Sequence, residues 1–194
     1  IYAIHNIGDC EVMDKKEQTR EVLFHSLEEL MRQKPFEKIK VGEIAAGAGL
    51  SCRTFYNNFT DKYALAMWHY RSGLEKILAR VGDHYSYEDA TRDSMYMMME
   101  KKDFYRELMR FEGQNDFFHS VFVANSQQFA SYVRSLNHNE QLSEEIEFEI
   151  EFFYRGCIEM AIKWCRNGMK ESPEDFIAMM DRCIPEDLRA YRLS

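Results

Sequence analysis

Proline and glycine are scarce in this chain, which has only three prolines and nine glycines among 194 residues. Few segments therefore have the composition of a linker or a disordered region, and long uninterrupted helices are favoured. No apolar run approaches the roughly 18 residues that a membrane span needs. No secretory signal pattern precedes the first predicted helix. We expect a soluble protein of the cytoplasm that has no membrane partner.

Paired cysteines are also missing. The five cysteines are odd in number, widely separated and without a Cys-x-x-Cys pair: Cys10, Cys52, Cys157, Cys165 and Cys183. This spacing favours free thiols in a reducing compartment over a disulfide framework or a zinc site. Cys157 and Cys165 lie on an apolar helical segment, which predicts that they pack in a core.

The motifs of common enzyme classes are absent as well. The sequence has no phosphate-binding loop, nucleophile elbow or dinucleotide fingerprint. His84 with Glu88, and Asp116 with His119, share helical faces, but neither pair has a third partner or the spacing of a metal site. We therefore predict no catalytic residue, no metal ligand and no cofactor, and an enzyme is the remotest of the functions considered.

Charge is unevenly distributed along the chain. The net charge is -8, which taken alone disfavours nucleic acid as a partner. The stretch from Lys15 to Lys62, however, carries nine basic and seven acidic residues, whereas the remainder from Tyr63 carries sixteen and twenty-three. A mildly basic head on an acidic body is compatible with DNA binding through the head.

Apolar residues recur at spacings of three and four along most of the chain, and no convincing strand pattern occurs. The predicted fold class is therefore all-α, with about nine helices. We expect them near residues 15–33, 41–48, 51–58, 61–81, 86–101, 102–111, 115–136, 142–168 and 173–183. Ser172 followed by Pro173 is a strong helix start, and Gly168 and Pro185 are expected stops.

The most informative stretch runs from Lys40 to Phe59. Two short helices there are separated by Gly49, which can take the left-handed conformation of a tight turn, and the second is capped by Ser51. The small residues Ala45 and Ala48 allow the helices to approach closely. Such a unit can present its second helix to the DNA major groove.

These residues resemble the helix-turn-helix of the TetR family of transcriptional regulators. The matched positions are Val41, Ile44, Ala45, Ala48, Gly49, Leu50, Ser51, Thr54, Phe55, Tyr56, Phe59, Lys62 and Leu65. The resemblance covers about fifty residues, from Lys15 to Leu65. The later segments 153–164 and 167–174 look like one bacterial branch of the family, which includes regulators similar to the dihydroxyacetone-kinase activator.

The resemblance implies a DNA-binding set around the second helix: Lys40, Ser51, Arg53, Thr54, Tyr56, Asn57 and Lys62. Arg53 is the best candidate for reading bases, because a guanidinium can pair with guanine O6 and N7. Thr54 and Tyr56 have hydroxyls suited to phosphate, and Asn57 could reach a base or a phosphate. Lys62 is expected at a phosphate, and the Lys40 ammonium is expected to reach either phosphate or the backbone.

Several positions depart from the family pattern. Gly42 stands where a polar or basic residue is frequent, Cys52 and Arg53 replace a frequent Arg-Gly pair, and Asn57 and Asn58 replace aromatic or basic residues. The operator sequence therefore cannot be carried over from a relative. A redox role for Cys52 is a minor alternative.

From Phe152 to Cys165 the helix predicted near 142–168 is apolar around most of its circumference, which requires partners on two sides. With the helix from Pro173 it would form a two-fold interface between subunits, as the resemblance also implies. We predict a homodimer whose interface includes Phe153, Cys157, Ala161, Trp164, Phe176 and Met180. Two recognition helices could then enter successive major grooves of a palindromic operator.

Aromatic and methionine residues are concentrated in the central helices. The resemblance implies an effector cavity there, for which flexible methionines and tyrosine hydroxyls would suit an amphipathic small molecule, although core packing explains most of these residues equally well. The predicted pocket residues are Tyr96, Met99, Tyr105, Met109, Phe118 and Phe122.

These expectations divide the chain into three parts: a tail or a remnant ahead of Met13 (1–12), a helix-turn-helix DNA-binding domain (13–62) and a helical effector and dimerisation domain (63–194). The predicted function is a transcriptional regulator, with repression favoured, that binds double-stranded DNA under the control of a small molecule. The alternative is a co-regulator that acts mainly through a protein partner and binds DNA weakly.

Overall fold

The computed structural model describes residues 14–82, 84–109, 115–138 and 141–192, and for 115–122, 124 and 192 it describes the backbone alone. The described part is all-helical, as predicted, and contains ten α-helices and one short 3-10 helix. The helices are α1 (Lys15–Gln33), η1 (Phe36–Lys38), α2 (Val41–Gly47), α3 (Cys52–Tyr56), α4 (Lys62–Leu78), α5 (Tyr87–Glu100), α6 (Lys102–Met109), α7 (Asn115–Leu136), α8 (Glu144–Arg166), α9 (Pro173–Asp181) and α10 (Glu186–Arg192).

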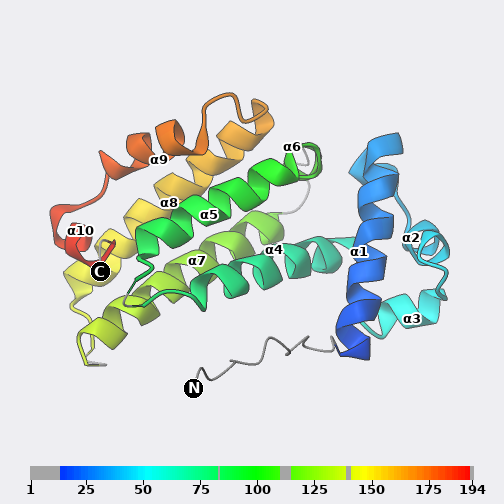
Figure 1. Ribbon diagram of the computed structural model, residues 1–194, viewed down its shortest axis with the longest axis horizontal. Coiled ribbons are helices and arrows are strands. Elements are labelled where there is room, and N and C mark those ends of the chain that lie inside the picture. The colour runs from blue at the N-terminus through cyan, green and yellow to red at the C-terminus, as the bar shows by residue number, and fades with distance from the viewer. Residues whose placement is uncertain (1–13, 83, 110–114, 139–140, 193–194) are drawn as a thin grey trace, which may run out of the picture.

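Figure 1 shows α1, α2 and α3 grouped at one end of the molecule as a head, from which α4 runs into the body formed by the remaining helices. Within the body, α7 packs against α8, α5 packs against α4 and α9, and α6 packs against α8. Helix α6 also contacts α1, so the body touches the head both through α4 and through α6. No helix in the described ranges is long and apolar enough to cross a membrane.

The predicted helix caps are confirmed. Ser51 Oγ accepts the Thr54 N–H at 3.0 Å, and Ser172 Oγ accepts the Asp175 N–H at 3.1 Å. The Asp61 carboxylate accepts the Ala64 N–H at 2.8 Å and so caps α4. Each of these oxygens satisfies a backbone donor that the first turn of a helix leaves unpaired.

Pro185 follows the end of α9, as expected for a stop, and it also precedes α10, a helix that was not predicted from the sequence. Glu186 and Asp187 lie in the first turn, where carboxylates complement the helix dipole. Leu188 is fully buried in a cluster with Phe129 and Ile150, which fastens α10 to the far end of the body. A proline between two helices can follow the first and precede the second, and the burial of Leu188 explains why the second helix forms here.

The hydrophobic core of the head continues into the body. One cluster joins Leu23 and Phe24 of α1 and Phe55 of α3 with Phe104 of α6 and Trp164 of α8. A second cluster fills the end of the body that is distant from the head. Because one core spans both parts, a movement of the body helices displaces side chains that support the head.

Candidate nucleic-acid interface and ligand cavity

The turn between α2 and α3 sets the angle of the second helix. Gly49 has a φ of +67°, in the left-handed region that glycine adopts without steric cost. The Gly49 N–H donates to Ala46 O at 3.0 Å and the Leu50 N–H donates to Ala45 O at 2.8 Å. This pair of bonds forms a Schellman motif, which ends α2 and turns the chain into α3.

Helix α3 is anchored on its inner side and open on its outer side. Phe55 is fully buried and Phe59, just beyond the helix, is nearly so. Arg53, Tyr56 and Asn57 are exposed and share one face, because residues three and four apart are neighbours on a helix. Tyr56 is 60% exposed, a high value for a large aromatic side chain. This face combines a fork of N–H donors, a phenol and an amide, the groups that bind base edges and phosphates.

Ser51 and Thr54 belong to the framework of the helix more than to its outer face. Their hydroxyl groups lie 2.9 Å apart and Ser51 is occupied as the cap, while Thr54 O accepts from Asn58 Nδ2 at 2.9 Å. These bonds hold the first turn of α3 in place, whatever contacts the exposed hydroxyl of Ser51 makes with a partner.

Lys62 lies in the first turn of α4, as expected, but its ammonium is bound within the chain. Its ammonium donates to three carbonyl oxygens: Phe36 O at 2.7 Å, Glu37 O at 2.9 Å and Ile39 O at 3.0 Å. It also lies 4.7 Å from the centroid of the Phe36 ring. Since an ammonium has three N–H groups, the expected phosphate contact would require these bonds to break. Lys62 therefore fastens the start of α4 to the loop that precedes α2, and burial lowers its pKa.

Lys40 also differs from expectation. Its ammonium is not the group that meets the backbone: the carboxylate of Glu43 accepts the Lys40 backbone N–H at 2.9 Å. The hydrogen bond from Lys34 holds the pKa of that carboxyl below its usual range, so it remains an acceptor. The Lys40 side chain is exposed on the head. It is therefore free of the backbone contact and accessible to a phosphate.

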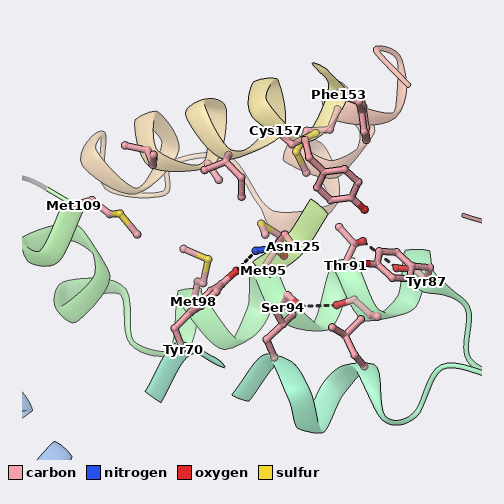
Figure 2. Close-up of a pocket in the computed structure, with 18 residues that line it drawn as sticks. Tyr70, Tyr87, Thr91, Ser94, Met95, Met98, Met109, Asn125, Phe153 and Cys157 are labelled. Atoms are coloured by element: carbon pink, nitrogen blue, oxygen red, sulfur yellow. Dashed lines mark hydrogen bonds between the residues drawn. The ribbon is translucent and has the colours of Figure 1, made fainter. Parts of the chain in front are cut away.

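The body contains a cavity of about 80 Å³ between α4, α5 and α8. Figure 2 shows Met109 at one end of this cavity and Tyr87 and Phe153 at the other. The α5 wall is formed by Tyr87, Thr91, Ser94 and Met98, which recur at the helical spacing of four, three and four.

Of the predicted pocket residues, Met109 lines this cavity. Tyr96 instead lies at the surface and donates to the Glu174 carboxylate, and Met99 packs half-buried against the core. Tyr105 is fully buried in the core, and its hydroxyl has no hydrogen-bond partner in the described part of the chain. Phe118 and Phe122 lie outside the residues whose side chains are described. Tyr96 lies on the opposite side of α5 from the lining positions, whereas Met99 follows the lining residue Met95 by one turn but is not part of the lining.

The sequence analysis missed the polar residues of the cavity. Tyr70 of α4 and Asn125 of α7 are joined by a hydrogen bond of 3.0 Å from Asn125 Nδ2 to the tyrosine oxygen. Burial raises the pKa of Tyr70, so its phenol keeps its proton. The sequence does contain a sign of Tyr70. It is spaced by four residues from Leu74, which is spaced by four from Leu78, so this polar residue shares the inward face of α4 with two apolar ones.

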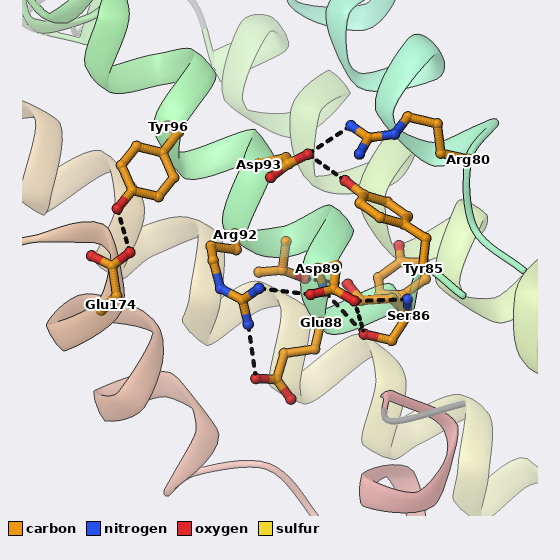
Figure 3. A network of polar contacts seen from close by, with 11 residues as sticks. Arg80, Tyr85, Ser86, Glu88, Asp89, Arg92, Asp93, Tyr96 and Glu174 are labelled. Carbon is orange, nitrogen blue, oxygen red and sulfur yellow. Dashed lines mark hydrogen bonds and ion pairs between the residues drawn. The ribbon is translucent and has the colours of Figure 1, made fainter. Parts of the chain in front are cut away.

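The turn between α4 and α5 is held by a polar network close to Tyr87 (Figure 3). Asp93 accepts from Arg80 at 2.7 Å and from the Tyr85 hydroxyl at 2.6 Å. Burial and the hydrogen bond to Asp93 raise the pKa of Tyr85 to about 12. At the helix start, Ser86 Oγ and the Asp89 carboxylate cap each other's backbone N–H groups. These bonds fix the position from which α5 begins.

The predicted dimer residues are buried within one chain. Phe153, Ala161, Trp164, Phe176 and Met180 are each at most 8% exposed, and Cys157 is half-buried. The reason is that α9 folds back on α8 in the same chain: the Trp164 and Phe176 rings are stacked with centroids 4.9 Å apart. The predicted residues therefore pack within the chain, although all of them except Ala161 also line a groove between α8 and α9.

The outer side of α8 carries a second apolar stripe. Phe148 and Phe152 are 69% and 71% exposed and Met160 is 48% exposed. Their spacing of four and eight places them along one face of the helix. Met179 of α9 is also exposed and, with Phe152 and Met160, lines a groove between the two helices. Exposed apolar groups in such a row are typical of an interaction surface.

Metal chemistry has no visible basis here: within the described ranges, no group of three or more His, Cys, Asp or Glu residues could hold a metal ion.

Two family models match the sequence. Residues 23–66 match the bacterial regulatory proteins of the tetR family, and residues 86–186 match a transcriptional regulator C-terminal region. The first match contains α2 and α3, and the second spans α5 to α9 with their cavity and exposed stripe. No curated protein matches the chain.

Several solved structures are similar to the chain, and the first two described here share its fold. The dihydroxyacetone kinase operon activator DhaS superposes with a TM-score of 0.66 at 15% identity, over 90% of this chain and 98% of that one. Thermus thermophilus FadR, a transcriptional repressor solved with lauroyl-CoA, gives a TM-score of 0.56 at 17% identity, over 85% and 92%. RolR, solved with resorcinol, superposes with a TM-score of 0.49 at 19% identity, over 88% of this chain and 89% of that one. At these identities the likeness concerns the fold alone.

Proposed function

The chain belongs to the TetR family of transcriptional regulators, and from that premise we propose that it is a homodimeric repressor in the cytoplasm that releases a palindromic operator when a small molecule fills its body. The observation that carries the proposal is the outer face of α3, where Arg53, Tyr56 and Asn57 are exposed on a helix anchored from behind by Phe55. Arg53 would read a base, and Tyr56 and Lys40 would contact phosphates.

Dimerisation follows from the geometry of DNA. A five-residue recognition helix offers few base contacts, so a second copy, about 34–36 Å away, is needed to read a second major groove. The outer stripe of α8, formed by Phe148, Phe152 and Met160, together with Met179 of α9, supplies an apolar surface for a two-fold contact. In this proposal the interface centres on the exposed residues of α8 and α9, and the groove there is also lined by the predicted residues Phe153, Cys157, Trp164, Phe176 and Met180.

Effector control is supported by the position of α6 between the cavity and the head. Met109, the last residue of α6, lines the cavity, and Glu107 of the same helix accepts the Phe36 N–H of the head at 3.2 Å. At the other end of α6, Lys101 forms an ion pair of 2.8 Å with Glu28 of α1. A ligand that displaces α6 would thus move contacts of the head, and a preference for one arrangement would shift the population of DNA-competent dimers.

We place the division between head and body after Lys62. The three bonds from its ammonium to the loop at 36–39 tie this residue to the head, although the helix that it begins continues into the body. Helix α4 is therefore shared, with its first turn in the 13–62 unit and the rest in the 63–194 unit.

Selection of duplex DNA from a random pool by the full chain tests this function. We expect enrichment of a palindromic site, bound with an affinity that falls steeply as salt rises, because phosphate contacts release counterions. Arg53→Ala should abolish or relax the selected sequence. Arg71→Ala is the matched control, because Arg71 is an exposed arginine of the body.

Absence of any enriched site from a folded dimer would contradict the proposal. This result would favour the alternative function, that of a co-regulator that works through a protein partner. Enrichment of the same site by the wild type and by Arg53→Ala would support DNA binding but would contradict a role for Arg53 in base recognition.

A further inference from the structure

The shape of the cavity restricts what can occupy it. Its lining runs from Tyr87 to Met98 along α5 and from Phe153 to Ile162 along α8, which at about 1.5 Å per residue corresponds to roughly 13–16 Å. A volume of about 80 Å³ spread over this length describes a narrow slot. An apolar cavity that binds benzene has a volume of about 150 Å³, which is larger than this slot. The slot therefore fits a linear chain better than a ring.

The polarity of the slot excludes a charged occupant. Among the described residues that line it there is no Asp, Glu, Lys, Arg or His. The hydroxyls of Thr91 and Ser94 donate to the carbonyls of Tyr87 and Ala90 on their own helix, at 2.9 Å and 2.7 Å, and are thereby satisfied. A carboxylate or ammonium buried here would lose its hydration without gaining an ionic partner, which is strongly unfavourable.

One donor in the slot remains available. The Tyr70 oxygen accepts the hydrogen bond from Asn125, so its own O–H is directed elsewhere, and it has no acceptor in the described part of the chain. Figure 2 shows this bond beside Met95 and Met98, on the inner surface of the slot. Tyr70 is 5% exposed, so water in the bulk cannot satisfy the proton at low cost.

Methionines supply the flexibility that a small slot needs. Met95, Met98 and Met109 line its Tyr70 end, and unbranched thioether side chains adjust their rotamers more readily than branched ones. A chain longer than the slot in its present state can therefore be accommodated by side-chain rotation.

We propose that the slot binds a linear, uncharged aliphatic molecule with one acceptor oxygen, such as an aliphatic alcohol, aldehyde or ester, and that Tyr70 donates to this oxygen. The regulatory role of the ligand rests on the proposed function above, but its binding does not. The slot selects by the absence of an ionic partner among its described lining residues and by the oriented phenol of Tyr70 as a donor.

Calorimetric titration of the full chain with octan-1-ol, octanoate and octylammonium at neutral pH tests the assignment, because these probes share one chain and differ in charge. Octan-1-ol is expected to bind, and the two ions at least a hundredfold more weakly. Tyr70→Phe should weaken the binding of octan-1-ol about fivefold, which is the effect of losing one neutral hydrogen bond. Tyr96→Phe, which removes a tyrosine hydroxyl outside the slot, should leave the affinity unchanged.

Met98→Ala provides a second, independent variant, since it lengthens the space beside Tyr70. It should increase the affinity for dodecan-1-ol relative to octan-1-ol several-fold. Octanoate binding as tightly as octan-1-ol would overturn the proposal, as would the absence of octan-1-ol binding to folded protein. An unchanged affinity of Tyr70→Phe for octan-1-ol would contradict the hydrogen bond assigned to Tyr70. An unchanged chain-length preference of Met98→Ala would contradict the contact assigned to Met98.

Operator binding measured with and without octan-1-ol separates this inference from the proposed function. Octan-1-ol that binds the slot but leaves operator affinity unchanged would support the ligand class and contradict effector control. Release of the operator by a charged molecule, with no binding of octan-1-ol, would retain effector control and overturn the ligand class.

Discussion

The imidazole ring of His69 lies flat against the phenyl ring of Phe24, with ring centroids 3.6 Å apart and planes inclined by 10°. His69 belongs to α4 and Phe24 to α1, so this stack joins the helix that enters the body to the first helix of the head. Phe104 of α6 meets the edge of both rings. Three helices thus converge on one aromatic cluster between the head and the cavity.

Acid should weaken the fold through His69. Its Nε2 is buried without a partner in the described part of the chain, and burial, followed by the nearby Lys101, lowers its pKa from 6.5 to about 4, with Glu28 opposing weakly. The unfolded chain therefore binds the proton first, and stability is lost as pH falls from about 6.5 towards 4. The loss is expected to reach about 3 kcal/mol.

Urea unfolding at pH 7, 5.5 and 4.5 measures this effect in the wild type and in His69→Phe, which keeps an aromatic ring on Phe24 but does not titrate. As the pH falls, the free energy of unfolding of the wild type should decrease more than that of His69→Phe. Parallel pH profiles would show that His69 is not the group responsible.

Lys62→Met should destabilise the chain by about 2 kcal/mol or more, because hydrogen bonds to a charged group are the stronger ones and three carbonyls of the 36–39 segment lose their donor. Lys38→Met is the matched control, since Lys38 is an exposed lysine of the same segment, and should change stability little. Chemical unfolding measures both. If Lys62→Met weakened DNA binding with no change in stability, Lys62 would be a phosphate contact after all.

Two glycines of α2 should respond to alanine in opposite ways. A Cβ on Gly47 would lie 2.4 Å from Ser26 Oγ, and this hydroxyl donates to Ile44 O at 2.8 Å. A Cβ on Gly42 would only meet Cys52 Sγ, at 3.8 Å. Gly47→Ala should therefore destabilise by about 1 kcal/mol or more through the displaced hydrogen bond, whereas Gly42→Ala should stabilise by up to about 1 kcal/mol.

A double-mutant cycle isolates the cause. In Ser26→Ala the hydroxyl is absent and the remaining Ser26 Cβ position lies at an ordinary 3.5 Å from the new methyl group. Gly47→Ala should then become neutral or stabilising, with a coupling of about 1 kcal/mol between the two sites. Equal effects of Gly47→Ala in both backgrounds, by thermal or urea unfolding, would contradict this steric explanation.

The sequence predicted those features that depend on neighbours along the chain. Ser51, Asp61 and Ser172 cap helices, and Gly49 turns the chain, because each acts within a few residues of itself. The partner of Lys62 lies 23 to 26 residues away, and no local pattern shows that three carbonyls converge there.

Helix α8 shows what periodicity leaves open. From Phe152 to Cys165 its sequence is apolar around most of the circumference, and periodicity alone does not say which side the rest of the same chain covers. Packing of α9 on Trp164 buries Trp164 and Phe176 and leaves Phe152 and Met160 exposed at the same groove. Most of the cavity lining was missed for a related reason, because Tyr70 and Asn125 come together from α4 and α7, which are distant in sequence.

Two variants of α3 should separate contacts that position the helix from contacts that read sequence. Tyr56→Phe removes an exposed hydroxyl expected at a phosphate, so it should weaken specific and random DNA by a similar factor. Arg53→Ala should weaken the selected site by about 1–3 kcal/mol and random DNA much less. Fluorescence anisotropy with both duplexes measures this, and an equal loss on both duplexes for Arg53→Ala would assign Arg53 to the phosphates.

The outer stripe of α8 should control association of the chain. Replacing Phe152 and Met160 together by serine removes exposed apolar area without touching the buried residues, so we expect a folded monomer that binds the palindromic site far more weakly than the wild type. Val22→Ser is the matched control, because Val22 is an apolar residue 46% exposed on α1 of the head, and should leave the dimer intact. Sedimentation equilibrium gives the oligomeric state and circular dichroism verifies the fold. A double variant that stays dimeric would move the interface away from this stripe, because two serines in place of Phe152 and Met160 leave too little apolar surface there to hold two chains together.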